Sequence, residues 1–89
     1  MRILRKVARM SSAISQTLPL ELLATGEQGT VVEVDGDPNL VIRLEEIGLH
    51  SGVVVRMIQP GSPCILEINH QRYSFRFDES IHVLVDLTP

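Results

Sequence analysis

Apolar and polar residues alternate in several short stretches of this chain. Between Gln28 and Asp35, Val32 and Val34 alternate with acidic residues. The same two-residue period recurs in 53–58, 64–69, 72–77 and 81–87. A period of two places one side of each stretch in a core and the other side in solvent, which is typical of β-strands. The pattern therefore predicts five short strands.

One stretch between the first two strands has a helical period instead. In residues 39–47, leucine or isoleucine recurs every three or four positions, which places these side chains on one face of a helix. Asp37 is a suitable N-cap, Pro38 fits the first helical position, and Gly48 is a suitable C-terminal cap. These signals predict one helix, inserted after the first strand.

The leucine-rich segment 17–23 precedes the first strand. Thr17 can cap a helix, Pro19 is tolerated in a first helical turn, and Gly26 ends the segment. We expect one or two helical turns whose leucines close one end of the core.

Glycine and proline separate these elements. The residues expected to shape turns and corners are Gly26, Gly29, Gly48, Gly52, Pro60, Gly61 and Pro63. Short strands joined by tight turns favour a small barrel over an open sheet. The sequence thus predicts an all-β fold, a small five-stranded barrel with one inserted helix and a short N-terminal helical turn.

The composition limits the class of protein. The chain has 89 residues, which is enough for one domain, and 44% of them are apolar. With Cys64 as the only cysteine, no intramolecular disulfide can form, which fits a reducing compartment. No segment contains the roughly 20 consecutive apolar residues that a membrane helix needs, and no secretory signal is evident. We therefore expect a cytoplasmic protein without a membrane span.

The charges divide the chain into two parts. Residues 1–16 carry four basic residues and no acid, whereas residues 18–89 carry all eleven acids and only four basic residues. An acidic body repels phosphate backbones, so nucleic acid is a poor candidate partner for the barrel. We expect residues 1–16 to form a basic and flexible extension, and residues 17–89 to form the domain.

The basic extension also has an apolar stripe. Ile3, Val7, Met10 and Ile14 are spaced by four, three and four residues, as on one face of a helix. Two interpretations stay open: an amphipathic helix that binds a membrane surface or a partner, and a frayed terminal segment, since a short isolated helix is marginal in water.

The order of the elements, and the glycine and proline residues that separate them, resemble those of the FeoA family. The resemblance covers residues 17 to about 87. Its main features are Gly26-x-x-Gly29, Gly36-Asp37-Pro38, Arg43-Leu44, Ile47-Gly48-Leu49 with Gly52, and Pro60-Gly61-Ser62-Pro63. The most specific feature is the pair Arg43-Leu44 in the helix, together with Ile47-Gly48-Leu49 at the end of the helix and Gly52.

The resemblance implies both a fold and a pathway. Members of this family look like SH3-like barrels and act with FeoB, a membrane permease for ferrous iron that has a cytosolic GTP-binding domain. The expected function is therefore that of a non-enzymatic cytosolic accessory of bacterial ferrous iron uptake, which binds the cytosolic part of a FeoB-type permease and modulates it. A homo-oligomer is a further expectation that the sequence leaves open.

The alternative is a metal-responsive module that binds a divalent transition metal ion. Cys64 and His70 are its candidate ligands, because they share one side of a predicted strand. Their separation of six residues corresponds to about 20 Å along a strand, which argues against a shared ion. The histidines and the cysteine also lack the short spacings of known metal motifs. No cofactor is otherwise expected.

Candidate chemistry is sparse elsewhere. The chain has no nucleophile elbow, phosphate-binding loop or recognisable carboxylate pair, so no catalytic residue is expected. The outward face of the predicted helix is the best candidate for a partner-binding surface. Its residues are Asn39, Ile42, Arg43 and Glu46.

Overall fold

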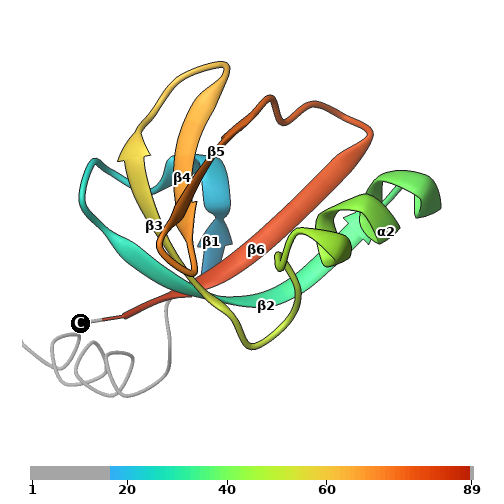
Figure 1. Cartoon of the computed structure of the whole chain (residues 1–89), viewed down its shortest axis with the longest axis horizontal. Helices are drawn as coiled ribbons and strands as arrows, with labels where there is room; N and C mark the ends of the chain where they lie inside the picture. The colour runs from blue at the N-terminus through green and yellow to red at the C-terminus, as the bar shows by residue number, and fades with distance from the viewer. Residues whose placement is uncertain (1–16, 89) are drawn as a thin grey trace, which may run out of the picture.

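The computed structural model describes residues 17–88 and consists mostly of β-structure (Figure 1). Its strands are β1 (Thr17–Pro19), β2 (Gln28–Gly36), β3 (Val54–Gln59), β4 (Cys64–Ile68), β5 (Gln71–Phe75) and β6 (Ile81–Leu87). A 3₁₀ turn, η1 (Leu20–Leu22), follows β1, and the helix α2 (Pro38–Glu46) follows β2. The predicted all-β class with one inserted helix is confirmed.

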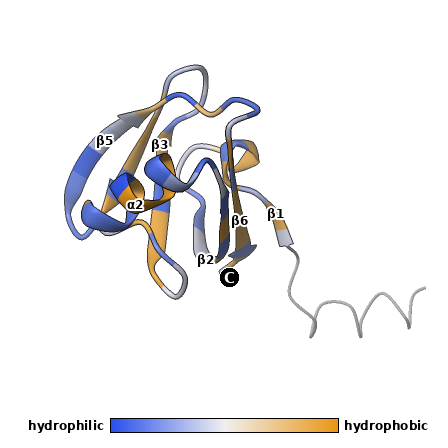
Figure 2. Cartoon of the chain, turned by 90° about the vertical axis from the view of Figure 1, so that its right-hand side faces the viewer, coloured by the Kyte–Doolittle hydropathy of each residue, from blue (hydrophilic) through white to orange (hydrophobic). Residues whose placement is uncertain are grey.

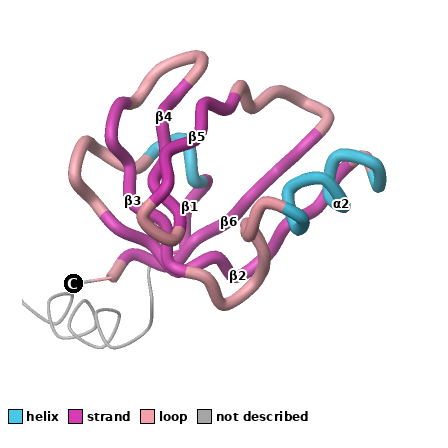
Figure 3. Tube along the Cα trace, viewed as in Figure 1, coloured by secondary structure: helices cyan, strands magenta, loops and turns pink. Residues whose placement is uncertain are grey.

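The six strands form a single antiparallel sheet in the order β1-β6-β2-β3-β4-β5. The sheet curls around the core, so that β5 and β6 lie on opposite sides of it in Figure 2. Strands β1 and β5 are the two edges. The segment 76–80 connects β5 to β6 without regular structure (Figure 3).

Strand β1 was missed by the sequence prediction, which counted five strands. Thr17 does not cap a helix. It pairs with Asp86 of β6, and its Oγ1 donates a hydrogen bond of 2.6 Å to the Asp86 carboxylate. Pairing along β6 satisfies backbone groups that would otherwise need local partners. The expected helical turn is present, but it is a single 3₁₀ turn at Leu20–Leu22.

The core is built from aliphatic side chains. Among the described residues no polar or charged side chain is buried. The buried residues are Leu20, Leu23, Val31, Leu44, Leu49, Val55, Met57, Cys64, Leu66, Ile68, Ile81, Val83 and Val85. Their burial supplies the main stabilisation of a domain that has no disulfide.

Helix α2 begins and ends as its sequence signals predict. The side chain of Asp37 accepts a hydrogen bond of 2.8 Å from the backbone N–H of Asn39, and Pro38 opens the helix. At the other end, the N–H of Leu49 donates to the Leu44 carbonyl at 2.9 Å, and Gly48 has a φ of 100°. These caps satisfy backbone groups that the short helix would otherwise leave free.

Gly29 does not lie in a turn, where the sequence analysis placed it. It lies within β2, opposite β6, and an alanine Cβ at this position would be 2.8 Å from Cγ2 of Val85. The absence of a side chain therefore lets the buried Val85 pack directly against the β2 backbone. By contrast Gly26, Gly48, Gly52 and Gly61 have positive φ angles outside the strands.

The basic extension 1–16 lies outside the described residues. Its predicted helix and apolar stripe are therefore sequence-based expectations only. No helix within residues 17–88 is long and apolar enough to cross a membrane.

Candidate functional site

The outward face of α2 presents the four residues predicted for partner binding. Asn39, Ile42, Arg43 and Glu46 are all exposed, and 52% of the Ile42 surface is accessible to solvent. On the opposite side Leu44 joins the core. The helix is thus amphipathic, with an isoleucine near the centre of its polar side.

An apolar groove lies between α2 and the segment that links β5 to β6. It has a volume of about 290 Å³. The lining residues are Leu40, Leu44, Phe75, Arg76, Phe77, Asp78, Ser80 and Ile81. The groove therefore combines leucines from the helix with aromatic rings from the end of the edge strand.

One hydrogen bond joins the two walls of the groove, and two more fix the loop that forms one of them. The N–H of Asp37, at the start of α2, donates to the Ser80 carbonyl at 2.8 Å. The Asp78 carboxylate accepts bonds from the hydroxyl and the N–H of Ser80, at 2.6 and 2.8 Å. These bonds from Ser80 lower the pKa of Asp78. The loop is therefore fixed beside the helix, with an ionised carboxylate at its surface.

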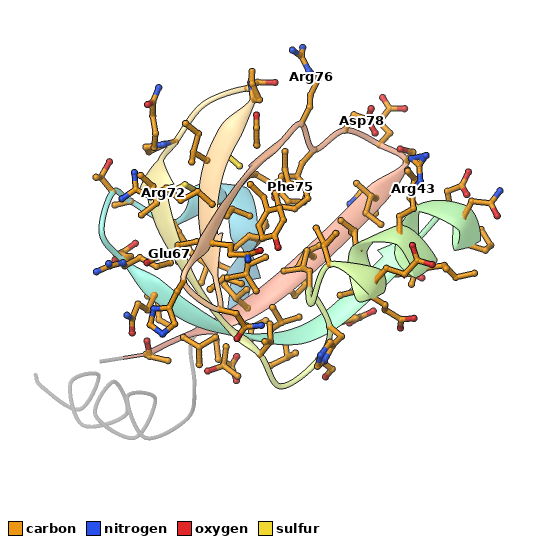
Figure 4. The ribbon with its side chains drawn as sticks, in the orientation of Figure 1. Arg43, Glu67, Arg72, Phe75, Arg76 and Asp78 are labelled. Carbon is orange, nitrogen blue, oxygen red and sulfur yellow. The ribbon has the colours of Figure 1, made fainter. Side chains whose placement is uncertain are left out.

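Phe75 and Phe77 of the groove form a short ladder of aromatic rings with Tyr73. The ring centroids of Tyr73 and Phe75 are 6.1 Å apart, and those of Phe75 and Phe77 are 5.8 Å apart. All three side chains are half-buried and pack against the core cluster. In Figure 4 Phe75 points into the molecule, whereas Arg76 points away from it.

The sequence analysis did not recognise the groove. Because β5 is an edge strand, no further strand covers the flank of Phe75 and Phe77. The available signal was the presence of all three aromatic residues on one side of one strand.

The surroundings of the groove favour binding over catalysis. Arg43 and Arg76 provide cationic groups near its apolar lining, and Asp78 provides an anionic one (Figure 4). Within residues 17–88 the only ion pair is that of Arg56 with Glu67, at 3.1 Å, so both arginines are available to a partner. An apolar side chain flanked by a charged group would match this arrangement.

Comparison with known proteins identifies the fold around this groove. A model of the FeoA domain matches residues 18–87, which include α2 and every residue of the groove. The chain belongs to the FeoA family. A crystal structure described as that of an iron uptake regulatory protein (FeoA) resembles this FeoA domain with a TM-score of 0.75 and 23% sequence identity. The match covers 82% of this chain and all of the other. No curated protein matches significantly.

The family match confirms the resemblance inferred from the glycine and proline pattern. The structural match shows that the SH3-like barrel expected for a FeoA domain is formed. The basic extension 1–16 lies outside the matched residues.

The two candidate metal ligands of the FeoA domain lie apart. Cys64 opens β4 and pairs with Phe75, whereas His70 is in the turn at the other end of that strand, beyond the pair Ile68 and Gln71. Cys64 is fully buried and His70 is exposed. No group of three or more His, Cys, Asp or Glu residues within 17–88 is arranged to hold a metal ion.

The Cys64 thiol is expected to be unreactive in the folded protein. The thiol has no solvent-accessible surface, and burial raises its pKa above the ordinary value. Since the thiolate is the reactive form, an aromatic disulfide reagent at pH 8 should label Cys64 at least roughly a hundredfold more slowly than in the urea-unfolded chain. Labelling at the same rate in both states would contradict the buried position.

Proposed function

We propose that this FeoA domain is a non-enzymatic cytosolic accessory of bacterial ferrous iron uptake, which binds the cytosolic GTP-binding part of a FeoB-type permease and modulates it. The observation that carries the proposal is the FeoA match over residues 18–87. The description of the similar crystal structure as an iron uptake regulatory protein supports the same pathway.

The α2 region supplies the contact surface in this proposal. Ile42 and Arg43 lie on the exposed face of the helix, and the apolar groove lies along its flank. An apolar group surrounded by polar and charged groups is a common composition for the centre of a protein interface. The lining of the groove is mostly apolar, with one arginine, one aspartate and one serine, and this composition fits recognition.

The double variant Ile42→Asp with Arg43→Glu tests this surface. Both side chains are exposed, so the variant should fold normally, as judged by its thermal unfolding and circular dichroism. It removes an apolar contact and reverses a charge, and binding to the permease's cytosolic domain should weaken by at least about a hundredfold in calorimetry.

A matched control is Leu22→Asp with Arg72→Glu, which makes the same change of charge at two other exposed positions. This control should bind as the unmodified protein does. If the folded α2 variant binds with undiminished affinity while the unmodified chain binds, the proposed surface is wrong. If the unmodified chain does not bind the permease domain at all, the proposed function is wrong.

No specific observation favours the metal-responsive alternative. Calorimetric titration with Fe²⁺ under anaerobic conditions, or with Zn²⁺, distinguishes it from the leading proposal. Tight binding at a fixed stoichiometry that is lost in Cys64→Ser or His70→Ala would support the alternative.

A further inference from the structure

The sheet has an exposed apolar surface that is separate from the α2 groove. Val32 and Val54 are 38% and 48% exposed, although each follows or precedes a buried valine in its strand. Val31 and Val55 point into the core, so Val54 lies on the outer face of the sheet, and Val32 is exposed at the irregular pairing between Val31 and Glu33. Nothing among residues 17–88 covers these two side chains.

The same face carries three carboxylates, and Arg56, which β3 also presents there, already pairs with Glu67. Glu33 and Asp35 are exposed residues of β2, and Asp86 lies on the neighbouring strand β6. None of these three carboxylates forms an ion pair within the described part of the chain. A segment that covers this face would therefore need apolar side chains for the valines and basic side chains for the carboxylates.

The strand register places the start of the described chain beside this face. Thr17 of β1 pairs with Asp86 of β6, Asp86 pairs with Thr30 of β2, and Thr30 pairs with Val54 of β3. These four residues form one row across the sheet. Three intervals of about 4.8 Å give a width of about 14 Å from Thr17 to Val54.

The residues before Thr17 have the required chemistry. Their apolar stripe, Ile3, Val7, Met10 and Ile14, would extend over roughly 17 Å as a helix, which matches the width of the row. Arg2, Arg5, Lys6 and Arg9 supply four positive charges and no acid is present. The stripe ends only three residues before Thr17, so the segment can reach the row without a long connection.

We propose that residues 1–16 of this chain form an amphipathic helix that lies across the outer face of β6, β2 and β3 in the same molecule. The apolar stripe covers Val32 and Val54, and the basic side chains lie beside Glu33, Asp35 and Asp86. The proposal is independent of the proposed function, because the extension lies outside the residues of the FeoA match.

Lys6 makes this arrangement directly testable, because it is the only lysine in the chain and all eleven acids lie between Glu21 and Asp86. A carbodiimide joins an amine to a carboxylate only where the two groups touch. Treatment of the full chain at low concentration, followed by peptide mapping, should give intramolecular links from Lys6 to Glu33, Asp35 or Asp86. The variant Lys6→Arg should lose these links.

Two matched tail variants test the apolar contact. Val7→Asp with Met10→Asp places charge on the stripe and should reduce the yield of these links at least about tenfold, because burial of either side chain contributes at least a factor of ten in equilibrium. Ala8→Asp with Ser12→Asp makes the same change of charge on the far side of the predicted helix. This control should retain most of the links.

Four results would overturn the proposal. Links from Lys6 to Glu45, Glu46, Asp78 or Glu79 would place the extension at the α2 region. Links between two chains would assign it to a second copy. Equal yields of Lys6 links in the two tail variants would show that the apolar stripe does not hold the extension on the sheet. Absence of links, with binding of the extension to anionic lipid vesicles, would assign it to a membrane surface.

Discussion

Replacement of Gly36 by alanine should lower the free energy of unfolding by about 3–5 kcal/mol and bring the domain close to unfolding. Gly36 ends β2 with a φ of 141°, which residues with side chains rarely adopt. An alanine Cβ there would collide with the Ser80 carbonyl oxygen and lie 2.8 Å from the Ile81 Cα.

The contacted atoms cannot move cheaply. The Ser80 carbonyl accepts the hydrogen bond from the Asp37 N–H, and Ile81 begins β6 and contributes to the core. A Cβ at Gly36 would therefore push β6 away from the start of α2. The same displacement would open the apolar groove, since Ser80 and Ile81 line it.

Gly52→Ala is the matched control for Gly36→Ala. Gly52 also has a positive φ, of 95°, but no atom lies within 4 Å of the added Cβ. Its substitution should cost only the conformational penalty of about 1–2 kcal/mol. Urea-induced unfolding followed by circular dichroism measures both variants. Equal losses in the two variants would show that the close approach at Gly36 contributes nothing to stability.

Most of the sheet could be predicted because its signals are local. Alternation of buried and exposed residues marks β2 to β6, and the helix has its own caps and apolar face. Strand β1 has no such signal. Its three residues become a strand only by pairing with β6, about seventy positions away in the sequence, as Thr17 with Asp86.

The candidate site was only half predictable for a related reason. The exposed face of α2 follows from the helical period, which places Ile42 opposite Leu44. The groove depends instead on the edge position of β5, which leaves Phe75 and Phe77 partly uncovered, and on the contact between Ser80 and Asp37. Strand order and loop placement are long-range properties that residue patterns within one strand do not contain.

Gly29 has a structural role that the sequence did not show, and it leads to a coupling experiment. Gly29→Ala would place a Cβ 2.8 Å from Cγ2 and 2.9 Å from Cβ of Val85. Val85 is fully buried and its branched side chain has little rotational freedom, so it cannot move aside. The substitution should cost about 1–3 kcal/mol through overpacking.

Shortening Val85 should relieve that cost. Val85→Ala alone leaves a cavity and should destabilise the domain by about 2 kcal/mol, but it also removes the Cγ2 atom that the new methyl group of Gly29→Ala would meet at 2.8 Å, so that only the contact with the Cβ of residue 85 stays. The double variant should therefore lose at least about 1 kcal/mol less than the sum of the single variants. Val83→Ala is the control, because Val83 is also buried but pairs with Val34, further along β2. Gly29→Ala should be additive with Val83→Ala, and additivity with Val85→Ala as well would refute direct packing of Val85 against the glycine.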